Sequence, residues 1–237
     1  VGRVSAAGRM NTATGRLEEA SISAQKVDFA GLYAVFLKPM AEKSVFGDLT
    51  VTGQADWQFE LKDGQPKSFE LTLRDTDIRD NKGKFAFKQL QAHLPWDYDQ
   101  VKTQSVAYAS GHVLKLPLAK TQLQAQINRY ALSARKLSLP LLDGALNFTD
   151  LSAAIIDGQW YWHVSMNLTP ISMAEFSQAL GWPSMQGKIS GQVPQVSYAD
   201  EQLLMNGAMT FNVFNGTVGM NHLEIDDPLG VVPRLNA

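Results

Sequence analysis

The chain has 237 residues, of which 45% are hydrophobic and 19% charged, and its 21 basic and 23 acidic residues give a net charge of 21 − 23 = −2. So high a hydrophobic share excludes a disordered segment, and near-neutrality argues against nucleic-acid binding, which needs a basic surface. The absence of cysteine excludes disulfides, cysteine-ligated zinc, iron–sulfur clusters and thiol catalysis.

The two ends of the chain carry no targeting or membrane-spanning pattern. The chain begins with Val1-Gly2-Arg3 rather than Met, and no basic stretch followed by an apolar run is present. No window approaches the roughly 18 consecutive apolar residues of a transmembrane helix. Residues 230–235 are typical of the start of another strand. We therefore expect a segment of a longer protein, with any membrane anchor outside it.

Residues 49–61 show the clearest strand pattern. Apolar residues occupy the odd positions and polar residues the even ones, and this period of two predicts a β-strand with one buried face. Asp63-Gly64 is typical of a hairpin turn, and the return strand alternates in the same way. The apolar positions of the two strands are Leu49, Val51, Trp57, Phe59, Leu61, Phe69, Leu71 and Leu73.

Three aspartates follow the return strand, namely Asp75, Asp77 and Asp80. Their spacing resembles a calcium-binding loop, but Asp80 occupies the position of the required glycine and Ala86 the position of the bidentate glutamate. We interpret them as a solvated turn and predict no metal site.

The apolar residues of the next strand change parity along the chain. Phe85 and Phe87 lie at odd positions, whereas Leu90 and Trp96 lie at even ones. A parity switch within one short run predicts a β-bulge near residues 88–89.

Alternating strands continue to the end of the chain. Asp157-Gly158 and Asn215-Gly216 each separate two alternating runs and predict hairpin turns. The count comes to about fourteen strands, typical of a meandering antiparallel sheet. The apolar faces of the later strands include Trp160, Trp162, Met205, Met209, Phe211 and Val213.

Two segments break the strand pattern. Ser172 and Glu175 form a capping box, and Gly181 followed by Pro183 ends the segment, which predicts a short helix over 172–180. Residues 29–43 have apolar residues at helical spacing but contain Pro39, so we expect a short or broken helix there.

The two helical segments occupy equivalent places in two similar stretches of sequence. Each is followed by a Gly-Gln pair, Gly53-Gln54 and Gly191-Gln192, at a separation of 191 − 53 = 138 residues. Repeats that stack their apolar faces build extended β arrays. We therefore expect one β segment over 1–237, composed of two repeat units at about 20–140 and 141–237.

A family resemblance rests on the C-terminal part, roughly residues 165–235. The run 185–194 (MQGKISGQVP), followed by 196–198 (VSY) and 211–218 (FNVFNGTV), resembles the AsmA-like envelope protein superfamily, which includes TamB, YhdP and YdbH. The closing run 223–235 (LEIDDPLGVVPRL) is most similar to the YdbH-type members. The N-terminal half shares only the general pattern of alternating strands with that superfamily.

The resemblance implies an all-β segment of a long periplasmic protein that is anchored in the inner membrane and extends toward the outer membrane. Its antiparallel sheet would be elongated and curled into an open groove, and phospholipid acyl chains would pass along the apolar lining. The partners would be phospholipids, the rest of the same chain and, through parts outside this segment, both membranes. The residues that we assign to that lining are Leu49, Val51, Trp57, Phe59, Leu61, Phe69, Leu71, Leu73, Trp160, Trp162, Met205, Met209, Phe211 and Val213.

The residues themselves offer no arrangement for catalysis. The sequence contains no metal-binding histidine motif, no nucleophile elbow and no phosphate-binding loop, and its histidines are scattered. We therefore expect no enzymatic activity, no cofactor and no metal. The four histidines are His93, His112, His163 and His222.

Periodicity alone leaves the role of the apolar faces open. A closed β-sandwich core and an open groove both keep one face of each strand from water, and burying an acyl chain contributes about 0.8 kcal/mol per CH₂. The lack of convergent polar groups favours a groove over a selective pocket. The alternatives are a structural or scaffold envelope module without a ligand, and a carbohydrate- or small-ligand-binding β domain that uses Trp160 and Trp162.

Overall fold

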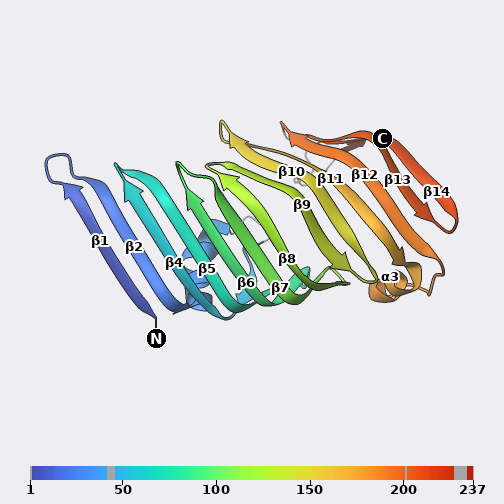
Figure 1. Cartoon of the computed structure of the whole chain (residues 1–237), viewed down its shortest axis with the longest axis horizontal. Helices are drawn as coiled ribbons and strands as arrows, with labels where there is room; N and C mark the ends of the chain where they lie inside the picture. The colour runs from blue at the N-terminus through green and yellow to red at the C-terminus, as the bar shows by residue number, and fades with distance from the viewer. Residues whose placement is uncertain (1, 42–45, 201, 227–233, 237) are drawn as a thin grey trace. The chain divides into compact units, whose positions relative to one another are not determined.

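The computed structural model describes residues 2–41, 46–200, 202–226 and 234–236. These residues form fifteen strands and a few short helical segments, and the strands pair antiparallel, almost always with their neighbours in sequence (Figure 1). Among the described strands the first, β1, does not pair with the last, so the sheet is not closed. The predicted all-β class with an open antiparallel sheet is therefore confirmed, and the alternative of a closed sandwich is wrong.

The chain divides into two compact units. Unit 1 comprises residues 1–114 and 120–129, and unit 2 comprises 115–119 and 130–237. The elements of unit 1 are β1 (Arg3–Asn11), β2 (Arg16–Asp28), α1 (Phe29–Leu32), the π-helix η1 (Tyr33–Leu37), α2 (Lys38–Ala41), β3 (Leu49–Val51), β4 (Gln54–Lys62), β5 (Gln65–Asp80), β6 (Phe85–Asp97), β7 (Lys102–Val113) and most of β8 (Leu116–Asn128).

Unit 2 repeats the meandering order of unit 1 and contains one helix. Its strands pair in the order β9-β10-β11-β12-β13-β14-β15. The elements of unit 2 are β9 (Ala131–Leu141), β10 (Gly144–Ile156), β11 (Gln159–Ser172), α3 (Met173–Leu180), β12 (Lys188–Ala199), β13 (Gln202–Val213), β14 (Gly216–Asp226) and β15 (Arg234–Asn236). Of the closing residues predicted to start a strand, 230–233 lie outside the described residues.

The single strand predicted over 49–61 is two strands, because the chain breaks at Gly53. The φ angle of Gly53 is +105°, and a Cβ atom there would lie 2.7 Å from the Cα atom of Thr76. Only glycine fits so close to the neighbouring backbone. Both resulting strands, β3 and β4, pair with β5.

The predicted bulge in β6 is confirmed, and β5 has one as well. Gln89 has a φ of 50° and Asp75 a φ of 46°, and the pairing of β5 with β6 shifts register around these residues. The Asp77 carboxylate accepts a hydrogen bond from the Gln89 backbone N–H at 2.8 Å. Carboxylates thus satisfy N–H groups that bulges remove from the ladder.

The interpretation of the three aspartates as a turn is wrong, although Asp75 and Asp77 are exposed to solvent as expected. All three lie in β5, and Asp80 is only 4% exposed, with its carboxylate accepting a hydrogen bond from the Lys84 backbone N–H at 2.8 Å. Bulges interrupt the period of two, so this strand does not show as an alternating run.

Both predicted helical segments are confirmed. Ser172 caps α3 through the Glu175 N–H, and Gly181 ends it in the left-handed conformation with φ 74°. Residues 29–41 are helical without interruption, with a π-helix between α1 and α2, so the segment is a short helix rather than a broken one. Residues 42–43 of the predicted segment lie outside the described residues. Among the described residues no helix is long and apolar enough to cross a membrane.

Two of the three predicted hairpin turns are confirmed. Asp63–Gly64 has φ values of 52° and 72°, and Asp157–Gly158 has 51° and 81°, as in type I′ turns. The third turn is displaced by one residue, because Phe214–Asn215 carry the positive φ values of 52° and 59°, while Gly216 already begins β14.

Candidate functional site

One face of the sheet in unit 1 is apolar, and the strand register establishes this. Trp57 of β4 pairs directly with Leu71 of β5, and Phe59 pairs with Phe69. Directly opposed residues point to the same side of a sheet. The apolar face of unit 1 consists of Ile22, Ala24, Ala55, Trp57, Phe59, Leu61, Phe69, Leu71, Leu73, Leu94 and Trp96.

The short strand β3 pairs with the C-terminal part of β5 and continues the apolar face of unit 1 there. Val51 pairs with Ile78 and is 5% exposed. Leu49 pairs with Asp80 and is half-buried. The predicted positions Leu49 and Val51 therefore lie beside the last residues of β5, next to the buried carboxylate of Asp80.

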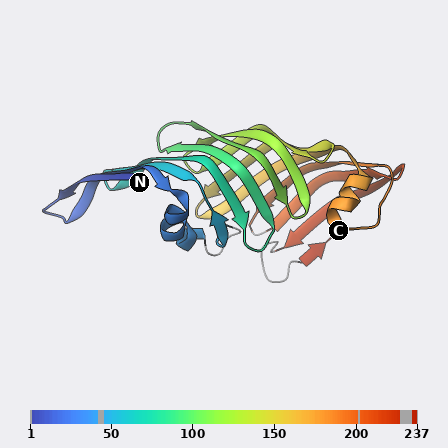
Figure 2. The ribbon, with the colours of Figure 1, turned by 90° about the horizontal axis from the view of Figure 1, so that it is seen from below.

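The apolar face of unit 1 is partly covered and partly open. Ala55, Leu71 and Leu73 are buried, whereas the aromatic rings of Trp57 and Phe59 are only half-buried. The segment from α1 to α2 lies beneath this face (Figure 2). The Phe36 ring lies 6.2 Å from the Trp57 ring and is still 55% exposed, so the helical segment adds apolar surface without sealing the face.

The opposite face of unit 1 is polar and internally paired. The Arg74 guanidinium contacts the Asp56 carboxylate at 2.6 Å, and Ser68 donates a hydrogen bond to Glu60 at 3.0 Å. The backbone N–H of Lys26 donates to Asp56, and together with Arg74 it lowers the pKa of that carboxyl below its ordinary value. The sheet is thus amphipathic across its thickness.

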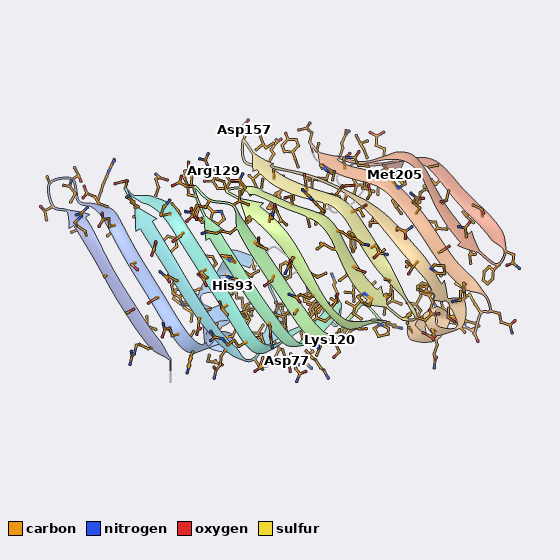
Figure 3. All side chains as sticks on the ribbon, in the orientation of Figure 1. Asp77, His93, Lys120, Arg129, Asp157 and Met205 are labelled. Atoms are coloured by element: carbon orange, nitrogen blue, oxygen red, sulfur yellow. The ribbon has the colours of Figure 1, made fainter. Side chains whose placement is uncertain are left out.

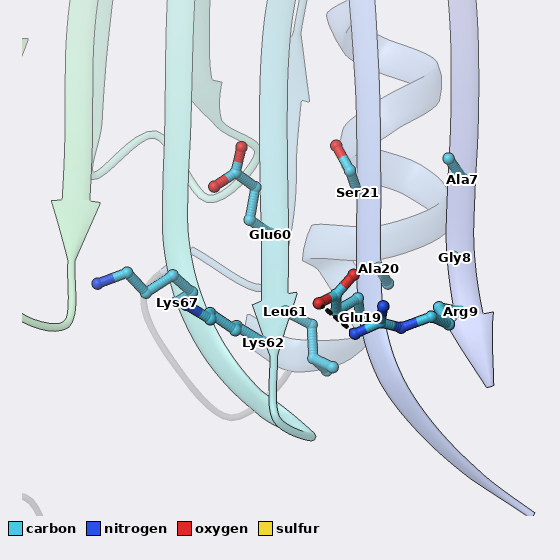
Figure 4. A pocket seen from close by; sticks show the side chains of 10 residues that line it. All are labelled: Ala7, Gly8, Arg9, Glu19, Ala20, Ser21, Glu60, Leu61, Lys62 and Lys67. Atoms are coloured by element: carbon cyan, nitrogen blue, oxygen red, sulfur yellow. Dashed lines mark hydrogen bonds and ion pairs between the residues drawn. The ribbon is translucent and has the colours of Figure 1, made fainter. Parts of the chain in front are cut away.

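A hollow in unit 1 is lined by residues of β1, β2, β4 and β5, and it combines Leu61 of the apolar face with Glu60 of the polar face (Figure 4). Two of its basic side chains are paired with carboxylates: Arg9 contacts Glu19 at 2.7 Å, and Lys67 contacts Asp97 and Asp99. These ion pairs reduce the positive charge that the hollow offers to an anionic ligand. The lining residues are Ala7, Gly8, Arg9, Glu19, Ala20, Ser21, Glu60, Leu61, Lys62 and Lys67.

Unit 2 has an apolar face of the same kind. Val196 of β12 pairs with Met205 (labelled in Figure 3), and Val213 pairs with Ile189. Met205 is fully buried. The apolar face of unit 2 consists of Ile155, Trp160, Trp162, Val164, Ile189, Gly191, Val196, Tyr198, Leu203, Met205, Met209, Phe211 and Val213.

The two tryptophans of β11 share this face but have different surroundings. Trp162 stacks on Tyr198 with ring centroids 5.7 Å apart and planes at 9°. Trp160 is 56% exposed and is the second residue of β11, which begins directly after the turn at Asp157 and Gly158. Figure 3 labels Asp157. Only Trp160 therefore presents an open ring, and the two do not form a joint platform.

Gly191 is a position of this face that the sequence analysis did not assign to it. It pairs with Phe211, and a Cβ atom there would lie 2.4 Å from Cδ1 of that ring. Because Gly191 has no side chain, the Phe211 ring can pack directly against the backbone of β12. A glycine inside an alternating strand is the signal that would have found it.

The opposite face of unit 2 is polar. Ser138 donates a hydrogen bond to Asn147 at 2.8 Å, Asn147 pairs with Asn167, and Asn167 pairs with Gln192. His163 lies on the same side, 3.5 Å from the Ser152 hydroxyl. This row of neutral amides and hydroxyls suits a face turned to water.

Within the described ranges, no group of three or more His, Asp or Glu side chains is placed to hold a metal ion. What each unit offers is a broad, half-exposed apolar face backed by a polar one. No protein-family model, curated protein or solved structure matches the chain.

Proposed function

We propose that this chain is a segment of a periplasmic lipid bridge, which shields phospholipid acyl chains on its apolar faces as they pass between the inner and outer membranes. The mode of action is non-covalent shielding. The observation that carries the proposal is the open apolar face of each unit, where aromatic residues such as Trp57, Phe59 and Phe211 are only half-buried. The resemblance to the AsmA-like envelope proteins supports the location and the lipid.

The energetics favour a long apolar ligand over a small one. Half-exposed aromatic and aliphatic side chains are unfavourable in water, and each CH₂ group of an acyl chain that covers them contributes about 0.8 kcal/mol. The residues that make up these faces, as defined above from the described strands, are apolar, so they offer few hydrogen bonds to any one headgroup. Weak, distributed contacts of this kind allow a chain to slide.

The rival functions have less support from the geometry. A scaffold module with a packed interior would bury Phe59 and Phe69, which are only half-buried. A carbohydrate platform would need both tryptophan rings free, but Tyr198 covers one face of Trp162.

The proposal is tested by site-specific photocrosslinking in lipid-loaded protein. A photoreactive phenylalanine analogue replaces Phe59 in unit 1 or Phe211 in unit 2, and mass spectrometry identifies the attached lipid. The matched controls are the adjacent residues Gln58 and Asn212, which lie on the polar faces. We expect phospholipid adducts at Phe59 and Phe211, and at most background labelling at the two controls.

Two results would contradict the proposal. Equal labelling at Gln58 and Phe59 would mean that lipid contacts the sheet without regard to its faces. Absence of both co-purifying phospholipid and adducts at Phe59 and Phe211 would indicate a structural module.

A further inference from the structure

A row of aromatic rings extends the apolar face of unit 1 onto β6 and β7. The rings of Phe85 and Phe87 lie 6.0 Å apart, and the ring of Tyr108 lies 5.0 Å from that of Phe87. Tyr108 lies two residues after Val106, which pairs with Ala92, and Ala92 in turn pairs with Leu73 of the apolar face. At 3% exposure, Tyr108 is one of the most buried aromatic residues in the described part of the chain.

The Tyr108 hydroxyl differs from every other buried side-chain polar atom among the described residues, because it has no hydrogen-bond partner there. A buried hydroxyl without a partner costs about 1–3 kcal/mol relative to a paired one. Phenylalanine would avoid this cost while filling nearly the same space. Packing alone therefore does not explain why this position carries a tyrosine hydroxyl.

A second buried tyrosine shows what a purely structural phenol does in this unit. The Tyr33 hydroxyl donates to the Phe46 carbonyl oxygen at 2.9 Å and accepts from the Leu49 backbone N–H at 3.0 Å. Tyr33 thereby ties the helical segment to the start of β3. Tyr108 makes no such tie, and burial alone raises the pKa of its phenol, so at neutral pH it is a protonated donor.

We infer that the Tyr108 hydroxyl is a ligand-binding group, which donates a hydrogen bond to a carbonyl oxygen at the carboxyl end of an acyl chain lying on the apolar face of unit 1. The inference rests on the proposed function and deepens it. A carbonyl oxygen is the acceptor that joins hydrocarbon to headgroup in a phospholipid ester and in a free fatty acid. Because the hydroxyl has no exposed surface, the ligand takes the place of a side chain that covers it.

The test compares Tyr108→Phe with the unaltered chain by fluorescence titration of three probes. Diphenylhexatriene has no oxygen, the methyl ester of cis-parinaric acid has an ester carbonyl, and cis-parinaric acid has a free carboxylate. We expect the substitution to weaken binding of one or both oxygen-bearing probes about five- to tenfold, the value of one net hydrogen bond, and to leave diphenylhexatriene binding unchanged. Whether the ester or the acid responds identifies the source of the carbonyl.

Thermal unfolding provides the control on folding. Tyr108→Phe should melt at the same or a higher temperature, whereas the matched Tyr33→Phe should melt lower because it loses two hydrogen bonds. A lower melting temperature for Tyr108→Phe would show a partner within the protein and overturn the inference.

The binding data separate the two proposals. Equal affinities of Tyr108→Phe and the unaltered chain for all three probes, or equal losses for all three, would overturn the role of the hydroxyl while the lipid groove stands. If the unaltered chain binds none of the probes, the proposed function itself fails, and this inference fails with it.

Discussion

The backbone N–H of Phe29 donates a hydrogen bond to the carbonyl oxygen of Gly53 across 3.0 Å. Phe29 is the first residue of α1, directly after the N-cap Asp28, and Gly53 lies immediately before β4. This bond fixes the start of the helix against the start of the strand that follows it. It therefore determines where the helical segment lies relative to the apolar face of unit 1.

Unit 2 contains the same hydrogen bond between the start of a helix and the start of a strand that follows it. The backbone N–H of Met173, the first residue of α3, donates to the carbonyl oxygen of Gly187 across 2.9 Å, immediately before β12. Gly187 also has a positive φ, 94° against 105° for Gly53. The Gly-Gln pairs of the sequence matched Gly53 with Gly191. The hydrogen bond from the first residue of the helix, however, is accepted by Gly53 in unit 1 and by Gly187 in unit 2. The repeat itself remains a prediction.

Replacing Gly53 by alanine should destabilise the protein by about 2–4 kcal/mol. The new Cβ atom would combine an unfavourable positive φ with a 2.7 Å approach to the Thr76 backbone, which cannot move without disturbing β5. Urea unfolding followed by circular dichroism measures the loss.

Gly187→Ala is the matched control, because a Cβ atom at Gly187 meets nothing within 4 Å. Its cost should be limited to backbone strain, about 1–2 kcal/mol. Equal losses at the two glycines would show that the close approach of Gly53 to Thr76 contributes nothing.

The strands and helix ends were predictable because each is encoded locally. Alternation identified β4 and the first half of β5, and the capping box with Gly181 gave the limits of α3 almost to the residue. It was also predictable that the assigned lining residues share one face within each unit, because strands joined by hairpins place their apolar sides on the same face of the sheet.

The features that were missed depend on contacts between strands. Gly53 fits the pattern of one strand over 49–61, and only the approach of Thr76 shows that the chain must break there. The aspartates of β5 resemble a turn until the bulge at Gln89 supplies an N–H for Asp77. The Tyr108 hydroxyl gives no sequence signal, because an unpartnered atom is defined only by its surroundings.

Acid should destabilise the protein partly through Asp56. The Lys26 backbone N–H and the Arg74 guanidinium hold the folded-state pKa of this carboxyl below its unfolded value of about 3.9. The stabilising contribution is therefore complete above that value and is lost as the pH falls through the folded-state pKa. Asp56→Asn, which keeps an acceptor oxygen but removes the charge, should lower stability at pH 7 and make the acid dependence shallower.

Asp143 gives an independent check in unit 2. The Ser172 backbone N–H, with Lys188 nearby, also holds the pKa of this carboxyl below its ordinary value. A double variant, Asp56→Asn with Asp143→Asn, should flatten the profile of urea midpoint against pH further than either single change. An unchanged slope in the double variant would place the acid sensitivity elsewhere.

Removing the N-cap of α3 by Ser172→Ala should cost about 1 kcal/mol, because the Glu175 backbone N–H loses its acceptor. The effect should be local, with faster amide hydrogen exchange in the first turn of α3 and little change in β12. Ser172→Thr keeps a hydroxyl acceptor and should restore most of the protection. Equal exchange in Ser172→Ala and the unaltered chain would show that the cap is not formed in solution.

A carboxylate placed on an apolar face should reduce lipid occupancy, whereas the same group on the polar face should not. Phe59→Asp puts a charge among Trp57, Phe69 and the acyl chains that we propose to lie there, and desolvating that charge is unfavourable. We expect co-purifying phospholipid, measured by mass spectrometry per mole of folded protein, to fall several-fold. Gln58→Asp, one residue away on the polar face, should leave it unchanged. Equal lipid content in the two folded variants would mean that the face of Phe59 does not contact lipid.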